Sequence, residues 1–225
     1  MNLKKLFQPR SLAVVGGYWT DFVLQGNHKL GFKGPIWHIN PTRTSSKKNK
    51  YFRSFKELPG IPDCVYIAVS RDLTVKVIKD FSSLGTGGAV CLASRFSETG
   101  SNKGLLRTKE LIKNSGAMPF LGPNCYGFIN YLDGVSVWSD QIAGKPAKNG
   151  IALICQSGTI GNTVSFNHRS LPIGYIISVG NQTCITIEDL IEYVLNDKRV
   201  TAIGIYAESF TNIELLVKVL EKAKQ

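Results

Sequence analysis

The sequence predicts an α/β protein in which strands and helices alternate along the chain. Short apolar, β-branched runs recur and end in turn residues, as in Ser11–Val15 and Cys64–Val69. Each of these runs is followed by a longer segment with helical apolar spacing, at about Thr20–Leu30 and Leu73–Leu84 respectively. Successive strand–helix units favour a parallel sheet, because the crossover helix returns the chain to the same end of the sheet.

The other elements are predicted from the same two patterns, the short apolar runs of strands and the apolar spacing of helices. Two short runs after residue 127 are expected to be strands or an irregular crossover. The further strands are predicted at about 36–40, 87–93, 118–121, 151–155, 175–179 and 200–206, the crossover runs at 128–130 and 135–138, and the further helices at about 103–115, 159–168, 187–195 and from 212.

Two domains are expected, because 225 residues exceed the usual size of one small domain. The segment Ile142–Gly150 has the composition of a linker, with glycine, proline and lysine but little apolar periodicity. The boundary is therefore placed near Asn149, which gives domains at 1–148 and 149–225. The second domain is expected to be incomplete.

Composition narrows the functional classes. With 43% hydrophobic residues the chain can bury a core, and it has neither an uninterrupted apolar run of membrane-spanning length nor a signal-peptide pattern. A cytoplasmic protein without membrane association is expected. The five cysteines are far apart and form no CxxC pair, so reduced, mostly buried thiols are expected and the spacing favours no metal site.

The formal charge of +11 makes an anionic partner plausible. Nucleic acid is the weaker interpretation, because the basic cluster after residue 40 is short and lacks an interleaved aromatic platform. The three histidines, His28, His38 and His168, are better explained as surface, strand and helix-end residues than as catalytic bases.

The stretch Leu121–Tyr131 (LGPNCYGFINY) joins the two series of elements. Gly122-Pro123 must end the preceding strand, which leaves Asn124 just past its carboxyl end. Ligands of open α/β sheets bind at that edge, and an Asn there offers both a donor and an acceptor. The alternative is a Pro-Asn turn without a ligand.

The first strand ends at Gly16-Gly17, which resembles the opening of a dinucleotide site, but the G-x-G-x-x-G pattern fails at Tyr18 and Asp21. The acidic residue that binds ribose hydroxyls in NAD enzymes is also absent after the second strand. Arg43 and the lysines that follow suit a phosphorylated ribose instead, as in NADP or coenzyme A. Arg43 is the preferred ligand-facing residue, and a solvated loop is the alternative, favoured for Lys48 and Lys50.

In the second series, a buried strand runs directly into Gln156–Thr159 and a helix. Small polar residues at such a turn leave backbone amides free to bind an anion, and an ordinary N-cap by Ser157 or Thr159 is the compatible alternative. Asn181 and Glu208 also follow strands, so the three loops should converge at the carboxyl edge of a second parallel sheet. Glu98 is expected to cap or charge the amino end of the next helix, with a ligand-facing position at the strand edge as the alternative, and is not expected to act in catalysis.

Eight motifs in order resemble one family: LFQPRSLAVVG, GFKGPIWHINP, ELPGIPD, GGAVCLAS, LGPNCYGFINYLDG, QSGTIGN, SVGNQ and Glu208. Together they resemble the N-terminal part of the ADP-forming acyl-CoA synthetases, of the acetate–CoA ligase type, which are relatives of the succinyl-CoA synthetase α subunit. The resemblance implies a Rossmann-like CoA-binding domain followed by a flavodoxin-like ligase domain. It also implies the reaction of an acid, CoA and ATP to acyl-CoA, ADP and phosphate, through an acyl phosphate and a phosphorylated histidine.

The resemblance also implies roles for residues. CoA binding is expected of Gly16, Gly17, Asn40, Arg43, Lys47 and Asn124, phosphate binding of Gln156, Ser157, Gly158 and Thr159, and catalysis of Ser157, Gly158 and Glu208, which pairs with the phosphohistidine. Neither that histidine's segment nor an ATP-grasp domain is recognised in this chain, so ATP/ADP and Mg are expected only through missing or partner domains.

Three functional classes remain open. The first is a catalytic part of a synthetase, inactive alone, which binds CoA and a carboxylic acid, is oligomeric, and can require a separate ATP-grasp chain. The second is a non-catalytic CoA-binding or regulatory module. The third is an NADP-dependent oxidoreductase. Retention of Ser157, Gly158 and Glu208 favours the first, because a simple CoA binder has no need of a phosphohistidine site.

Overall fold

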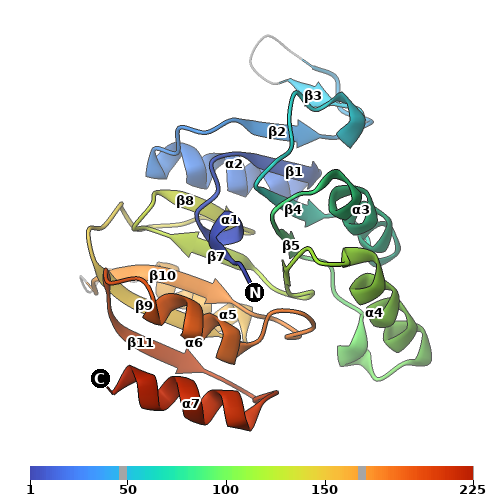
Figure 1. Cartoon of the computed structure of the whole chain (residues 1–225). Helices are drawn as coiled ribbons and strands as arrows, with labels where there is room; N and C mark the ends of the chain where they lie inside the picture. Colours follow the sequence, from blue (N-terminus) through green and yellow to red (C-terminus); the bar gives the residue numbers. More distant parts are fainter. Residues whose placement is uncertain (46–49, 167–170, 225) are drawn as a thin grey trace.

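A computed structural model describes residues 1–45, 50–166 and 171–224 of the chain. It has the predicted α/β architecture, with two sheets joined through a shared core (Figure 1). Among the described residues, no helix is long and apolar enough to cross a membrane. All five cysteines are free, and only Cys184 is not fully buried.

The first sheet has six strands in the order β3-β2-β1-β4-β5-β6, and each of its pairings is parallel, as predicted. A short helix near the amino terminus and a two-residue strand in the basic loop were not predicted from the sequence. The strands are β1 (Leu12–Gly16), β2 (Ile36–Ile39), β3 (Tyr51–Phe52), β4 (Cys64–Ala68), β5 (Ala89–Cys91) and β6 (Phe120–Leu121), and the helices are α1 (Lys4–Phe7), α2 (Tyr18–Leu30), α3 (Arg71–Leu84) and α4 (Asn102–Ser115).

Both faces of this sheet are covered, which explains the continuous apolar runs in its central strands. Alternate residues of β1 point to opposite faces: Ala13 and Val15 pack into a cluster with α3 and α4, whereas Leu12 and Val14 pack with α1, α2 and the second sheet. The first sheet thus sits between a layer of two helices and the rest of the molecule.

The second sheet has five strands in the order β11-β9-β10-β7-β8. The prediction of a second parallel sheet is correct for only three of these strands, because β7 pairs antiparallel with both β10 and β8. Four residues separate β7 from β8, which is enough for a hairpin but too short for the crossover that a parallel pair needs. The strands are β7 (Gly127–Asn130), β8 (Val135–Trp138), β9 (Gly150–Cys155), β10 (Ile173–Ser178) and β11 (Val200–Tyr206).

Three helices cover this sheet: α5 (Gly158–Ser165), α6 (Ile187–Leu195) and α7 (Ile213–Ala223). The division of the chain near residue 149 remains an interpretation of the sequence. The hydrogen bonding divides the chain earlier, because the hairpin β7–β8 forms part of the second sheet.

Helix α2 lies between the sheets and closes the exposed side of β8 (Figure 1). The buried Asn27 side chain accepts a hydrogen bond from the Ser136 N–H at 3.1 Å and donates to the Ser136 carbonyl. Gly26 brings the helix close, since a Cβ there would lie 2.8 Å from Ser136 Oγ. The backbone of the edge strand β8 is therefore hydrogen-bonded at Ser136 by the Asn27 side chain, where a neighbouring strand would otherwise pair.

Candidate functional site

A cleft of about 540 Å³ opens where the carboxyl ends of strands from both sheets meet. Its lining comes from the loops after β5, β6, β9, β10 and β11, and includes Glu98, Asn124, Ser157, Asn181 and Glu208. The structure therefore brings together the Asn124 loop and the three loops of the second series that the sequence placed at strand ends. Of the described residues that line the cleft, two are acidic and none is Lys or Arg.

Asn124 occupies a left-handed conformation with φ of 60°, which Asn tolerates better than most residues. Its backbone N–H donates to the Ala93 carbonyl at 2.9 Å, which fixes the loop against the end of β5. Its exposed side-chain amide donates to Asn181 Oδ1 at 3.3 Å. Among the described residues no group donates a hydrogen bond to Asn124 Oδ1, so this side-chain oxygen can accept one from a ligand in the cleft.

Glu98 bridges the two sheets. Its Oε2 accepts a hydrogen bond from Asn181 Nδ2 at 2.6 Å, and its Oε1 accepts one from the Arg95 N–H. The prediction that Glu98 caps the following helix is wrong, because Ser101 is the N-cap of α4 and its hydroxyl accepts from the Gly104 N–H. Glu98 instead orients Asn181, whose own oxygen faces Asn124.

The turn between β9 and α5 presents backbone amides to the cleft. Ser157 is the N-cap residue of α5, but its side chain makes no capping hydrogen bond. The amino end of a helix carries unpaired N–H groups and the positive end of the helix dipole, both of which favour an anion. The alternative prediction, that the Ser157 side chain caps this helix, is therefore wrong.

Three side chains hold the loop that carries Glu208. Gln156 Oε1 accepts the N–H groups of Glu208 at 2.8 Å and Ser209 at 3.0 Å, and Gln182 Nε2 donates to the Ser209 carbonyl at 3.1 Å. The third is Glu188, whose Oε1 accepts the Thr211 N–H at 2.8 Å.

Glu188 is fully buried, so its ionisation depends on these donors. Burial raises the pKa of the Glu188 carboxyl, but hydrogen bonds from Asn212, Thr211 and neighbouring groups outweigh burial and hold the pKa below its usual range. A buried carboxylate in the first turn of α6 thus anchors the start of α7 and the loop before it.

A second group of predicted residues lies at the end of β1, outside the lining of the cleft. Gly16 has φ of 139°, and a Cβ there would lie 2.3 Å from the Ala68 carbonyl oxygen, so only glycine fits. Asn40 Nδ2 donates to the Gly16 carbonyl at 2.7 Å, and its Oδ1 accepts the N–H of Arg43 at 3.0 Å. Gly17 is the N-cap of α2 and makes no side-chain cap.

Arg43, the preferred ligand-facing cation, forms an ion pair with Asp21 at 3.0 Å and contacts the Tyr51 ring. The hydrogen bond that Arg43 donates to the Asp21 carboxylate raises the pKa of Arg43, which stays charged. Lys47 and the neighbouring Lys48 lie outside the described residues. His168 does as well, while His28 is exposed.

His38 is buried beneath this turn, with Nε2 2.9 Å from the Thr20 hydroxyl. Burial lowers the pKa of His38 and nearby Arg43 adds to the effect, although the hydrogen bond to Gly16 and the charge of Asp21 act in the opposite sense. The imidazole is therefore held neutral and serves the packing of the turn.

Sequence reasoning missed four contributors to the cleft and its loops: Tyr126, Gln182, Glu188 and the bridging role of Glu98. Glu188 had a detectable signal, since it lies among the apolar positions of α6 at Ile187, Leu190 and Ile191. The others depend on contacts between residues distant in the sequence, for which no local pattern exists.

Two family models match the chain. Residues 10–131 match the CoA binding domain, and residues 148–225 match the succinyl-CoA ligase like flavodoxin domain. An ADP-forming acetate–CoA ligase II of Archaeoglobus fulgidus is 30% identical over 236 residues, which cover 100% of this chain and 35% of that protein. The α subunit of an ADP-forming acetate–CoA ligase II of Pyrococcus furiosus is 27% identical, with 98% of this chain and 49% of the subunit covered.

Among solved structures, the apo form of the dinucleotide-forming acetyl-coenzyme A synthetase 1 of Candidatus Korarchaeum cryptofilum superimposes with a TM-score of 0.86. The sequences are 27% identical, and the superposition covers 97% of this chain and 49% of that one. The chain spans about a third to a half of the length of these relatives.

Proposed function

Since the chain belongs to the CoA-binding domain family through residues 10–131, we propose that it is the part of an ADP-forming acyl-CoA synthetase that binds CoA and receives phosphate. The flavodoxin-like match over residues 148–225 corresponds to the ligase portion of the same enzymes. The complete reaction converts an acid, CoA and ATP to acyl-CoA, ADP and phosphate.

One observation carries this proposal: the uncapped amino end of α5 and the Glu208 carboxylate line the same cleft as Asn124. The amides of Gly158 and Thr159 are preorganised donors that can position a phosphoryl group for transfer. Glu208 is then placed to accept a proton or hydrogen bond from the group that delivers the phosphate. A CoA-binding module without phosphoryl chemistry has no use for this arrangement.

The residues at the end of β1 fit CoA. Gly16 permits close approach of the chain at the turn, Gly17 leaves the amino end of α2 without a side-chain cap, and Arg43 supplies a permanent cation. We assign the diphosphate of CoA to the backbone N–H groups at the amino end of α2, which begins after Gly17, and the 3′-phosphate to Arg43, with Lys47 as a further cation. When bound, CoA supplies the thiol that takes up the acyl group; Asn124 would face that end of the site.

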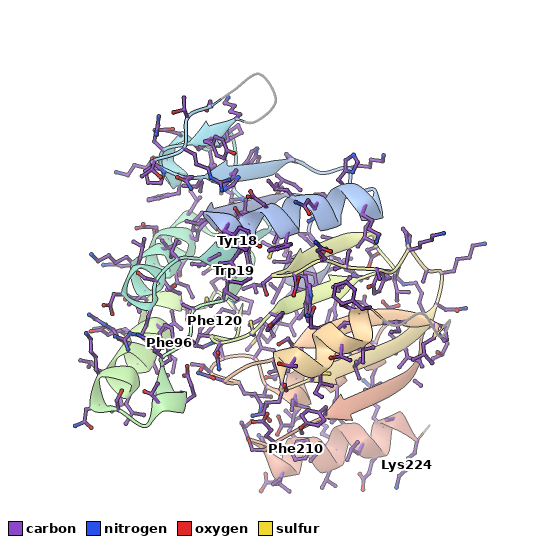
Figure 2. The ribbon with its side chains drawn as sticks, turned by 180° about the vertical axis from the view of Figure 1, so that it is seen from behind. Tyr18, Trp19, Phe96, Phe120, Phe210 and Lys224 are labelled. Atoms are coloured by element: carbon purple, nitrogen blue, oxygen red, sulfur yellow. The ribbon has the colours of Figure 1, made fainter. Side chains whose placement is uncertain are left out.

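A partner chain is part of the proposal. Strand β11 is an edge strand with Ile205 and Tyr206 exposed, and α7 exposes Ile213, Val217 and Leu220 on one face. Figure 2 shows Phe210, also exposed, in the loop beside this helix. Such an apolar surface supports association with another polypeptide, and the relative named as an α subunit supports a partner that carries the ATP-binding function.

The test has two stages. Isothermal calorimetry of the purified chain should detect binding of CoA but not, at equal concentration, of pantetheine, which lacks the diphosphate and the 3′-phosphate. Acyl-CoA formation from ATP, acid and CoA should be absent. Adding the remaining segments of a relative as a separate chain should restore turnover, and Glu208→Gln should abolish it without weakening CoA binding.

The outcomes separate the candidate functions. Turnover by the chain alone would contradict its role as one part of the enzyme. CoA binding with no turnover in the reconstituted mixture would favour a non-catalytic CoA-binding module. Full activity of the Glu208→Gln complex would remove Glu208 from the site.

A further inference from the structure

The first turn of α5 rests on two aromatic side chains. The Tyr126 and Trp138 rings pack with their centroids 5.5 Å apart. A Cβ on Gly158 would lie 2.1 Å from Tyr126 Cδ2, and a Cβ on Gly161 would lie 3.0 Å from Trp138 Cη2. The helix backbone therefore sits directly on the rings at both glycines, and a side chain at position 158 has no space.

The aromatic pair is itself fixed from several sides. The Tyr126 N–H donates to Ser178 Oγ at 3.1 Å, and the Tyr126 carbonyl accepts the Ser139 N–H at 3.0 Å. Trp138 is fully buried, and its Nε1 donates to Asn162 Oδ1 on α5 at 3.4 Å. The backbone of Tyr126 is thus held by β10 and by the residue after β8, and its ring packs against the buried Trp138.

Tyr126 also lines the cleft beside the turn that carries Ser157. The three atoms nearest to a Cβ added at Gly158 all belong to the Tyr126 ring, and Gly158 and Thr159 line the cleft at the same turn. The position of the Gly158 and Thr159 amides relative to Glu208 and Asn124 therefore depends on where the Tyr126 ring lies.

We propose that Tyr126 is a positioning residue for the anion-binding turn, and that Gly158 is glycine because the Tyr126 ring occupies the space of a side chain. The proposal rests on the function assigned to this turn above. On this proposal, position 158 requires glycine because of its packing against Tyr126, and not because the helix or the bound anion requires glycine there.

Whether Gly158→Ala raises or lowers stability and anion binding distinguishes these explanations. Ala favours a helix over Gly, and the φ of Gly158 is not in the left-handed region, so the substitution alone should be neutral or stabilising. A Cβ 2.1 Å from the ring must displace either Tyr126 or the start of α5. A loss of anion binding on Gly158→Ala that disappears when the ring is removed can come only from this contact.

The experiment is a double-mutant cycle on the full chain, with inorganic phosphate as the probe and the amide NMR shifts of residues 158 and 159 as the readout. The variants are Gly158→Ala, Tyr126→Ala, Tyr126→Phe and the double variant Tyr126→Ala/Gly158→Ala. Leu106→Ala, which truncates an exposed apolar side chain on α4, is the control. Thermal midpoints and CoA affinity are measured for every variant, because CoA is assigned to a separate turn.

Gly158→Ala should weaken phosphate binding about tenfold in the wild-type background but should cause little further loss in the Tyr126→Ala background, a coupling of the size found for residues in contact. Tyr126→Phe should bind phosphate like the wild type, since it keeps the ring. Tyr126→Ala should weaken phosphate binding while leaving CoA affinity unchanged. If Gly158→Ala does not fold, recovery of folding in the double variant gives the same support.

Additive losses in the double variant, with phosphate binding intact in the wild type, would overturn the role of Tyr126 alone. Absence of phosphate-induced shifts in the wild type would overturn the anion site itself and this role with it, while CoA binding would be unaffected. Equal effects of all variants on phosphate and CoA affinity would indicate general loss of structure and also contradict the proposal.

Discussion

The side-chain oxygen of Gln156 accepts the backbone N–H of Glu208 at 2.8 Å. Gln156 directly follows β9 and Glu208 lies just beyond β11, so one amide joins the ends of two adjacent parallel strands. The same oxygen accepts the Ser209 N–H, which ties the Glu208 loop to the turn that carries Ser157. The carboxylate and the free helix amides are thereby held at a fixed separation across the cleft.

Gln156→Ala should free this loop with a small loss of stability. Both N–H groups lie at the exposed cleft and can bind water, so we expect the free energy of unfolding to fall by only about 0.5–1.5 kcal/mol. Amide hydrogen exchange at Glu208 and Ser209 should accelerate, while Gln156→Glu should keep it slow because a carboxylate also accepts two N–H groups. Gln25→Ala on the exposed side of α2 is the control; unchanged exchange in Gln156→Ala would contradict the coupling.

Asn27→Leu should be far more destabilising, although Asn27 lies away from the cleft. Its side chain pairs both backbone groups of the buried Ser136, and leucine can pair neither. We expect a loss of about 2–4 kcal/mol in urea unfolding, the cost of two unpaired buried groups. The exposed His28→Ala on the same helix should change stability by less than about 0.5 kcal/mol, and an equally small effect of Asn27→Leu would show that β8 does not depend on this pairing.

His38 should make stability fall on acidification. Its folded pKa lies below the ordinary value of about 6.5, so the unfolded chain binds the extra proton and favours unfolding as the pH drops. The contribution is complete above about pH 6.5 and decreases below that pH toward the folded pKa. The charged groups that face the His38 ring, Asp21 and Arg43, remain in His38→Gln. The free energy of unfolding of this variant should therefore fall less than that of the wild type as the pH decreases from 7.

The measurement is the free energy of unfolding at several pH values for the wild type and His38→Gln. His28→Gln serves as the matched control, because it makes the same substitution at an exposed position of α2. Identical profiles for wild type and His38→Gln would show that the neutral imidazole does not contribute to stability in this range.

Arg43→Ala should remove the preference for CoA over dephospho-CoA. The guanidinium is held by Asp21 at 3.0 Å, so binding of the 3′-phosphate must share or replace that ion pair. A charge-assisted hydrogen bond supports a preference of about tenfold for CoA in the wild type, and Asp21→Asn should increase it by releasing Arg43. Calorimetry with both ligands tests this, with Lys113→Ala on α4 as a control; a ratio unchanged by Arg43→Ala would remove this loop from the phosphate site.

The sequence by itself determined the alternation of strands and helices, the carboxyl-end position of the polar loops, and the resemblance to CoA ligases. Each of these depends on local pattern: apolar periodicity marks β1 and α3, and Gly16-Gly17 and Gln156–Thr159 mark turns at strand ends, the edge where open α/β sheets generally bind ligands. The predicted helices begin within about two residues of α2, α3, α4, α5, α6 and α7 because caps and turn residues are also local. Helix α5, however, ends at Ser165 and not near residue 168, which lies outside the described residues.

Tertiary structure alone decided which loops meet and how they are held. Strands β7 and β8 pair antiparallel because their short loop permits no crossover. That this hairpin joins the second sheet through β10 is specified by no apolar pattern in two four-residue strands. Glu98 faces Asn181 across 83 positions of sequence, and Gly158 lies on Tyr126, which precedes it by 32 residues. Such contacts depend on the packing of two sheets, and for that reason the residues that position the site were visible only in the fold.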